Sequence, residues 1–265
     1  MKITENPTDL MVKIGSNSFY KSIGDKYFEK TISISDEASL CNEILISQYL
    51  SCKDNCKPYV HNYGVYYNND KIKIIAKIEK ESTNLVNFVY DLHRKGFIHN
   101  NICEERMIKF ADEPQYFNIA DLETVSLINK NPLSNKYYSK YRLPDDFYNF
   151  TNYLYIGDYF AIACILLKLK TNWNTEKNIL NQQNILKSII DDLKNYKTKS
   201  ILKNLIISII DFYYVLIETD NYIKGISPIF QFFYTSSIND MNNKLKNQQA
   251  IVNALIAELI VSNNL

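Results

Sequence analysis

The sequence predicts an α+β fold of two lobes. A five-stranded antiparallel sheet with one helix is expected in residues 1–80, and a mainly helical lobe in residues 81–265. Short runs of β-branched and aromatic residues, separated by Gly, Asn and Asp turns, predict the sheet. Long stretches with apolar residues at helical spacing predict the second lobe. A loop containing His and Asn, followed by a short apolar hairpin, is expected within that lobe.

Each strand and helix of the first lobe has its own sequence signal. The five expected strands span residues 10–14, 18–23, 26–32, 60–67 and 71–78. A helix is expected from Ser35 to about Leu50, because a Ser-Asp-Glu start precedes an apolar pattern. Leu40, Ile44 and Leu45 should form its buried side.

The second lobe should begin with a single helix, at residues 83–95, that stops at Gly96. A hairpin is expected from residues 107–110 and 116–120. Further helices should follow at residues 156–167, 176–196, 199–218 and 238–261. Their apolar residues recur at helical spacing and are expected in the core.

Composition limits the classes of partner. The chain has 265 residues and a formal charge of +1, which does not favour nucleic acid. The longest apolar runs, at residues 153–169 and 202–217, contain charged or amide side chains, so no membrane span is expected. The N-terminus lacks the apolar core of a secretory signal.

Five cysteines, an odd number, are typical of a reducing compartment, so we predict a cytoplasmic protein. Abundant Asn, Ile, Lys and Tyr indicate an AT-rich genome, as in a parasite, symbiont or large DNA virus. For a viral protein or a delivered effector, the predicted location is the host cytoplasm.

Residues 91–124 resemble the catalytic loop and metal-binding loop of the protein kinase superfamily, of the eukaryotic type. In the family pattern H-R-D-L-x-x-x-N, His99 takes the His position, Asn101 that of the Asp base and Arg106 that of the metal-binding Asn. Asp121 takes the position of the D-F-G aspartate, which holds magnesium in the family.

Two of the decisive residues are replaced. An amide at Asn101 can orient a hydroxyl but cannot accept its proton, and a guanidinium at Arg106 repels a metal ion. Only Asp121 remains. The resemblance is therefore to the degenerate members of the family, the pseudokinases.

The resemblance extends to the nucleotide-binding residues of the first lobe. Gly15 matches the first glycine of the glycine-rich loop, although a lone Gly is also simply a turn. Lys30 matches the phosphate-anchoring Lys, and Glu43 the helical Glu that pairs with it. The family thus implies ATP and magnesium. Asn17 and Tyr20 replace the other two glycines, so weak or absent nucleotide binding is expected.

Two structural motifs follow. Leu143–Asp145 resembles A-P-E, and the helix that contains Asp158 resembles the one at the centre of the family's large lobe. The resemblance implies that Asp158 accepts hydrogen bonds from the backbone of the catalytic loop. The Arg that holds the A-P-E carboxylate has no counterpart near the end of this chain, so Asp145 is expected to contact a Lys or the backbone.

The functional prediction is a pseudokinase that binds or allosterically regulates a partner protein, such as an active kinase or a host protein. The alternative is a divergent, active Ser/Thr protein kinase, with Lys30, Glu43 and Asp121 serving ATP-dependent transfer to protein hydroxyls. A third hypothesis is a small-molecule kinase of the same superfamily. The motifs at Leu143–Asp145 and Asp158 argue against it.

Overall fold

The structure is a computed structural model, and all structural statements below concern the part of the chain that it describes. It describes residues 2–3, 12–14, 18–23, 27–33, 37–51, 61–68, 71–77, 85–104, 107–110, 117–119, 122–130, 141–171, 173, 183–196 and 200–263.

The chain divides into two compact units, which we describe separately. The first unit comprises residues 1–139 and 151–158, and the second comprises residues 140–150 and 159–265. These bounds differ from the lobe boundary between residues 80 and 81, which stays a prediction.

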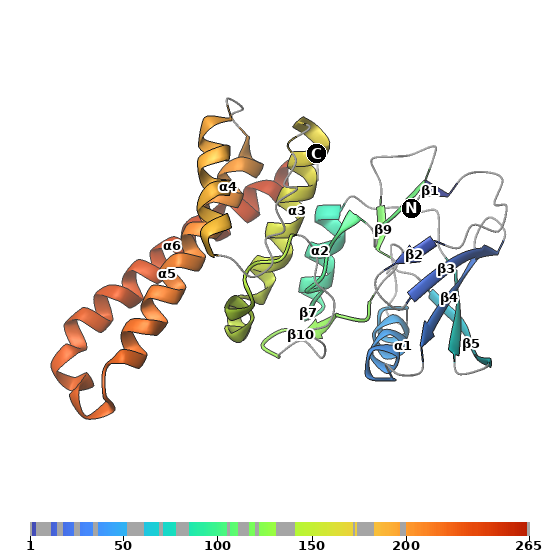
Figure 1. Cartoon of the computed structure of the whole chain (residues 1–265), viewed down its shortest axis with the longest axis horizontal. Coiled ribbons are helices and arrows are strands. Elements are labelled where there is room, and N and C mark those ends of the chain that lie inside the picture. Colours follow the sequence, from blue (N-terminus) through green and yellow to red (C-terminus); the bar gives the residue numbers. More distant parts are fainter. Residues whose placement is uncertain are drawn as a thin grey trace. The chain divides into compact units, whose positions relative to one another are not determined.

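The first unit contains a five-stranded antiparallel sheet in the order β2-β3-β4-β6-β5 (Figure 1). Its strands are β2 (Val12–Ile14), β3 (Ser18–Ile23), β4 (Tyr27–Ser33), β5 (His61–Asn68) and β6 (Lys71–Lys77). Helix α1 (Glu37–Ser51) follows β4 and contacts β5. A register shift between Asn62 and Gly64 marks an irregularity in the pairing of β5 with β6.

The rest of the first unit surrounds the predicted loop. Helix α2 (Leu85–Arg94) leads into β7 (Phe97–Ile98), which pairs antiparallel with β10 (Ser126–Leu127). The predicted hairpin is present as β8 (Met107–Phe110) and β9 (Phe117–Ile119). Strand β1 (Lys2–Ile3) pairs parallel with β8, a contact that no local sequence signal indicated.

The second unit is helical. Its elements are η3 (Asp145–Asn149), α4 (Gln183–Asn195), α5 (Ile201–Gly225), η5 (Pro228–Tyr234) and α6 (Thr235–Asn263). Helix α3 (Leu154–Thr171), preceded by η4 (Thr151–Tyr153), begins in the first unit and continues into the second. Helices α5 and α6 pack side by side as a hairpin joined by η5 (Figure 1).

The predicted fold class is wrong: although the expected five-stranded sheet is present, the part of the chain that the structure describes is mainly helical and does not form a two-lobed α+β, kinase-like fold. Helices α5 and α6 have 25 and 29 residues, whereas β5, the longest described strand, has 8. The prediction placed helices where α5 and α6 lie, but it took the fold class from the resemblance to a family and not from the share of helix.

Burial also corrects one helix face. Leu45 was expected on the buried side of α1, but its side chain is 64% exposed, and it is Glu43 that is buried. By contrast, residues 159–165 of α3 are all buried, as expected of a helix that is apolar on every side. Among the described helices, none has the length and apolarity needed to cross a membrane.

Candidate functional site

Helix α2 ends at a glycine that turns the chain into the candidate loop. Gly96 has a φ of +85°, and its N–H donates to the carbonyl of His93 at 2.9 Å. Glycine adopts this left-handed conformation without steric cost, which explains the helix stop that the sequence predicted. Strand β7 then places His99, Asn100 and Asn101 directly after it.

The carboxylate of Asp158, on α3, holds this loop. It accepts hydrogen bonds from the backbone N–H of His99 at 2.7 Å and from that of Asn100 at 2.8 Å. The Nε2 atom of His93, on α2, lies 2.9 Å from the same carboxylate. Asp158 is only 1% exposed, and these bonds offset the cost of removing its charge from water. The backbone contacts predicted for Asp158 are thus present.

Asn100 fixes the other side of the loop. Its φ is +65°, a conformation that Asn tolerates better than most residues. Its side-chain amide donates to the carbonyl of Thr124 at 2.9 Å and lies 2.9 Å from the hydroxyl of Ser126. The Thr124 hydroxyl donates to the carbonyl of His99 at 2.9 Å. The loop is therefore tied to the segment around β10.

Asn101, which stands in the position of the family's base, lies inside the protein. It is 2% exposed, and His99 beside it is fully buried. Within the described part of the chain, neither the oxygen nor the nitrogen of the Asn101 amide has a hydrogen-bond partner. A neutral amide in such a place can neither accept a proton from a substrate hydroxyl nor be readily reached by one.

The other predicted site residues are only partly described. Gly15, Arg106 and Asp121 lie outside the described residues. Lys30 pairs through its backbone with Ile74 of β6, and Glu43 of α1 is 3% exposed. The Lys30–Glu43 ion pair stays a prediction. No cluster of three metal-binding side chains occurs among the residues that the structure describes.

The expected partner of Asp145 was wrong. One carboxylate oxygen of Asp145 lies 3.7 Å from a guanidinium nitrogen of Arg142, three residues earlier in the chain. The Arg142 guanidinium also lies 3.9 Å from the centre of the Tyr148 ring. The prediction looked only for a distant arginine. A long-range contact is made instead by the neighbouring residue: Asp146 of η3 accepts a hydrogen bond from the hydroxyl of Tyr213 on α5 at 2.9 Å.

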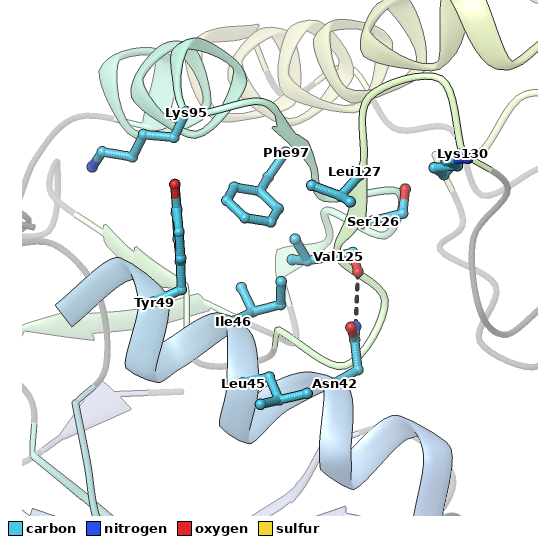
Figure 2. A pocket seen from close by; sticks show the side chains of 10 residues that line it. All are labelled: Asn42, Leu45, Ile46, Tyr49, Lys95, Phe97, Val125, Ser126, Leu127 and Lys130. Carbon is cyan, nitrogen blue, oxygen red and sulfur yellow. Dashed lines mark hydrogen bonds between the residues drawn. The ribbon is translucent and has the colours of Figure 1, made fainter. Parts of the chain in front are cut away.

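We call residues 99–101, which Asp158 holds, the anchored loop. A pocket of about 800 Å³ lies next to this loop, between α1 and the β7–β10 pair (Figure 2). It is lined by Asn42, Leu45, Ile46, Tyr49, Lys95, Phe97, Val125, Ser126, Leu127 and Lys130. At its edge, the Asn42 amide donates to the carbonyls of Val125 at 2.7 Å and Glu123 at 2.9 Å. Helix α1 is therefore tied to the same segment as the loop.

The junction of α5 and α6 carries a second candidate site, an exposed apolar surface that we call the tip patch. Its members, from 48% to 84% exposed, are Ile229, Phe230, Phe232, Phe233 and Tyr234. Backbone hydrogen bonding holds the segment in shape: the N–H of Phe230 donates to the carbonyl of Ser227 at 2.8 Å. Residues 225–239 contain no charged side chain.

Sequence reasoning missed several residues of these sites. Asn100 was not among the predicted site residues, although Asn adopts a left-handed conformation more readily than most residues. His93 and Asn42 gave no local signal, because their partners lie 65 and 83 residues away. No prediction was made for the segment at 228–234, which lies between two of the expected helices.

The sequence matches no protein-family model, and no curated protein matches it significantly.

Proposed function

We propose that this chain is a catalytically impaired protein that acts, in the manner of a pseudokinase, by binding a partner protein. The observation that carries the proposal is the tip patch. Phe232 and Phe233 are 84% and 76% exposed, and full burial of such a side chain contributes roughly 1.5–3 kcal/mol. Contiguous exposed apolar surface of this kind marks interaction sites.

The chemistry of the tip patch favours a particular surface on the partner. Charged groups facing it would lose water without gaining a counter-charge, since residues 225–239 carry none. Large aromatic side chains at the end of a helical hairpin are well suited to enter an apolar groove, where such residues dominate binding energy. The partner should therefore present an uncharged, apolar groove.

The buried amide of Asn101 supports impaired catalysis. A general base must reach the proton that it removes, and an amide does not accept one. We accordingly propose that binding of ATP and magnesium is weak or absent. The partner would be an active kinase or a host protein, met in the cytoplasm; the thiols of Cys41, Cys103 and Cys164, which are not in disulfides, are compatible with this location.

The alternative, a divergent Ser/Thr protein kinase, draws support from the loop held by Asp158. Phosphoryl transfer depends largely on positioning and charge stabilisation, so a fixed loop could retain some activity without a base. Nucleotide binding discriminates between the two proposals.

The first experiment tests partner binding with matched variants. Phe232→Ser/Phe233→Ser removes two rings from the tip patch. Ile251→Ser/Val261→Ser removes two exposed apolar side chains, 48% and 61% exposed, elsewhere on α6. A photo-crosslinking residue at Gln231 would identify the partner, and titration of the purified partner would give the Kd. We expect the tip variant to weaken binding at least tenfold, on the order of a single hot spot, with the control unchanged.

Other occupants of the tip patch give distinct outcomes. Concentration-dependent dimers that disappear in the tip variant would identify a second copy as the occupant, and co-flotation with uncharged phosphatidylcholine vesicles would identify a lipid surface. Either outcome, or a partner complex indifferent to the tip variant, would overturn the proposal.

The second experiment tests nucleotide binding through the thermal midpoint, with ATP in magnesium, ATP in EDTA, and no ATP. A ligand at a hundred times its Kd adds about 2.7 kcal/mol of stability, which shifts the midpoint measurably. We expect no shift. A magnesium-dependent shift that is lost in Lys30→Ala would favour the alternative and lead to phosphotransfer assays.

A further inference from the structure

The pocket beside the anchored loop has an apolar interior. Its walls come from two faces: Leu45, Ile46 and Tyr49 of α1 on one side, and Phe97 and Leu127 of the β7–β10 pair on the other (Figure 2). The Tyr49 and Phe97 rings meet edge to face, with centroids 5.3 Å apart. Leu45 and Leu127 are 64% and 54% exposed, so a ligand would cover apolar surface that water now contacts.

Among the described residues that line the pocket, the charged side chains are of one sign. They are Lys95 and Lys130, and in Figure 2 the side chains of Phe97 and Leu127 lie between them. Lysine donates hydrogen bonds and accepts none, so it favours an anionic oxygen over a neutral or cationic group. The pocket therefore offers an apolar interior with a cationic group at its edge.

The size of the pocket indicates a small molecule. Its volume of about 800 Å³ lies within the range of roughly 300–1,000 Å³ that is usual for small-molecule sites. Two of the polar lining groups already have partners: the Asn42 amide bonds to backbone carbonyls, and the Ser126 hydroxyl accepts from the Asn100 amide at 2.9 Å.

We propose that this pocket binds an amphipathic anion, a small molecule with an apolar body and one acidic group. The body lies between α1 and the β7–β10 pair, and the acidic group contacts Lys95 or Lys130. Such a ligand contacts the same two elements that Asn42 already joins. Its binding would stabilise the contact between α1 and the anchored loop. The site is separate from the tip patch, so it does not depend on the proposed partner.

The test compares three probes that share one apolar chain, below their micelle concentrations, by isothermal titration calorimetry. Decanoate is the anion, decan-1-ol the neutral analogue and decyltrimethylammonium the cation. We expect decanoate to bind about tenfold more tightly than decan-1-ol, and the cation to bind most weakly, as a half-buried Lys95 and an exposed Lys130 would give. Decanoate should also raise the thermal midpoint.

Variants assign the binding to this pocket. Lys95→Gln/Lys130→Gln should lower decanoate affinity about tenfold and leave decan-1-ol affinity unchanged. Leu45→Trp should block all three probes by filling the pocket. Lys187→Gln and Leu169→Trp change an exposed lysine and a leucine that is 47% exposed, both outside the pocket, and should have no effect.

Three results would overturn the proposal: no heat of binding with decanoate, equal affinity for the anion and the cation, or decanoate binding that is indifferent to both the lysine and the Leu45 variants. Should Leu45→Trp fail to fold, the lysine variant alone decides, because its two substitutions remove no apolar core.

Discussion

Two regions depart from the usual rule that polar side chains face water and apolar side chains are buried. They are the loop that Asp158 holds and the tip patch, and they depart from it in opposite ways. In the loop, a charged carboxylate and several amides are buried, and Asp158 is 1% exposed. In the tip patch, large apolar side chains face water, and Phe232 is 84% exposed. A buried polar group and an exposed apolar patch are the two observations about burial that carry most information.

The two regions differ in whether other residues of the chain satisfy the buried polar groups or cover the exposed apolar ones. In the loop, Asp158, Asn100 and Thr124 supply hydrogen bonds from within the same unit, although the buried Asn101 amide has no partner among the described residues. Nothing among the described residues covers the tip rings, so their apolar surface stays in water. We infer that the loop serves the stability of the first unit, whereas the tip patch serves an interaction.

Removing the Asp158 carboxylate should have the largest effect. In Asp158→Ala the N–H groups of His99 and Asn100 lose their acceptor in a buried place, so we expect a loss of about 3–5 kcal/mol in the free energy of unfolding. Asp158→Asn keeps one acceptor oxygen and should lose less. Urea denaturation measures both, with the exposed Asp191→Ala as a control within about 0.5 kcal/mol. A loss below about 1 kcal/mol for Asp158→Ala would contradict the anchoring role.

Asn100 should have an intermediate effect that two substitutions resolve. Asn100→Gly keeps the positive φ but loses the side-chain bonds, at a cost of about 1–2 kcal/mol. Asn100→Ala should cost about 1 kcal/mol more, because alanine is strained at this φ. Asn129 has the same backbone conformation, with a φ of +64°, on the exposed surface. Asn129→Gly should therefore change unfolding in urea very little, and equal costs for the two Asn100 variants would contradict the role of φ.

Local chemistry in the sequence predicted part of the loop. Gly96 identified the end of α2, and the acid at 158 with the His-Asn-Asn loop predicted which backbone groups would meet. The contribution of His93 could not be predicted, because its contact with Asp158 depends on how α2 and α3 pack. For Asp145 the error was local: Arg142 stands three residues away, but the prediction considered only an arginine near the end of the chain as a partner.

The fold class was not predictable from the same signals. Local patterns placed helices at residues 199–218 and 238–261, where α5 and α6 lie, but how such elements pack together depends on contacts between residues far apart in the sequence. The sequence also did not indicate which apolar residues would be exposed. The segment Ile229–Tyr234 has the composition of a core, and only the position of η5 at the end of the hairpin leaves it in water.

Aromatic residues within the same hairpin test whether the tip patch contributes to stability. Phe212 of α5 is fully buried, and Phe232 is 84% exposed. We expect Phe212→Ala to cost about 3–5 kcal/mol in urea denaturation, and Phe232→Ala less than about 0.5 kcal/mol. Comparable costs would mean that the tip rings pack against the protein in solution and would remove the basis for an interaction surface.

The smallest effect should come from charge on the hairpin. Desolvation raises the pKa of Asp211 above its ordinary value of 3.8, and Lys194 partly opposes this. A carboxyl with a raised folded-state pKa stabilises the protein below its unfolded pKa, and that stability is lost as the pH rises through the folded-state value. Asp211→Asn should therefore be the more stable protein at neutral pH, by only a few tenths of a kcal/mol because Asp211 is exposed by area and screened by water.

Urea midpoints at about pH 3 and pH 7 measure the difference in stability between the variant and the parent protein. A variant that is less stable than the parent at pH 7 would show that Asp211 gains more from Lys194 than it loses by burial, and that charge contributes to the stability of the hairpin as it does to that of the loop.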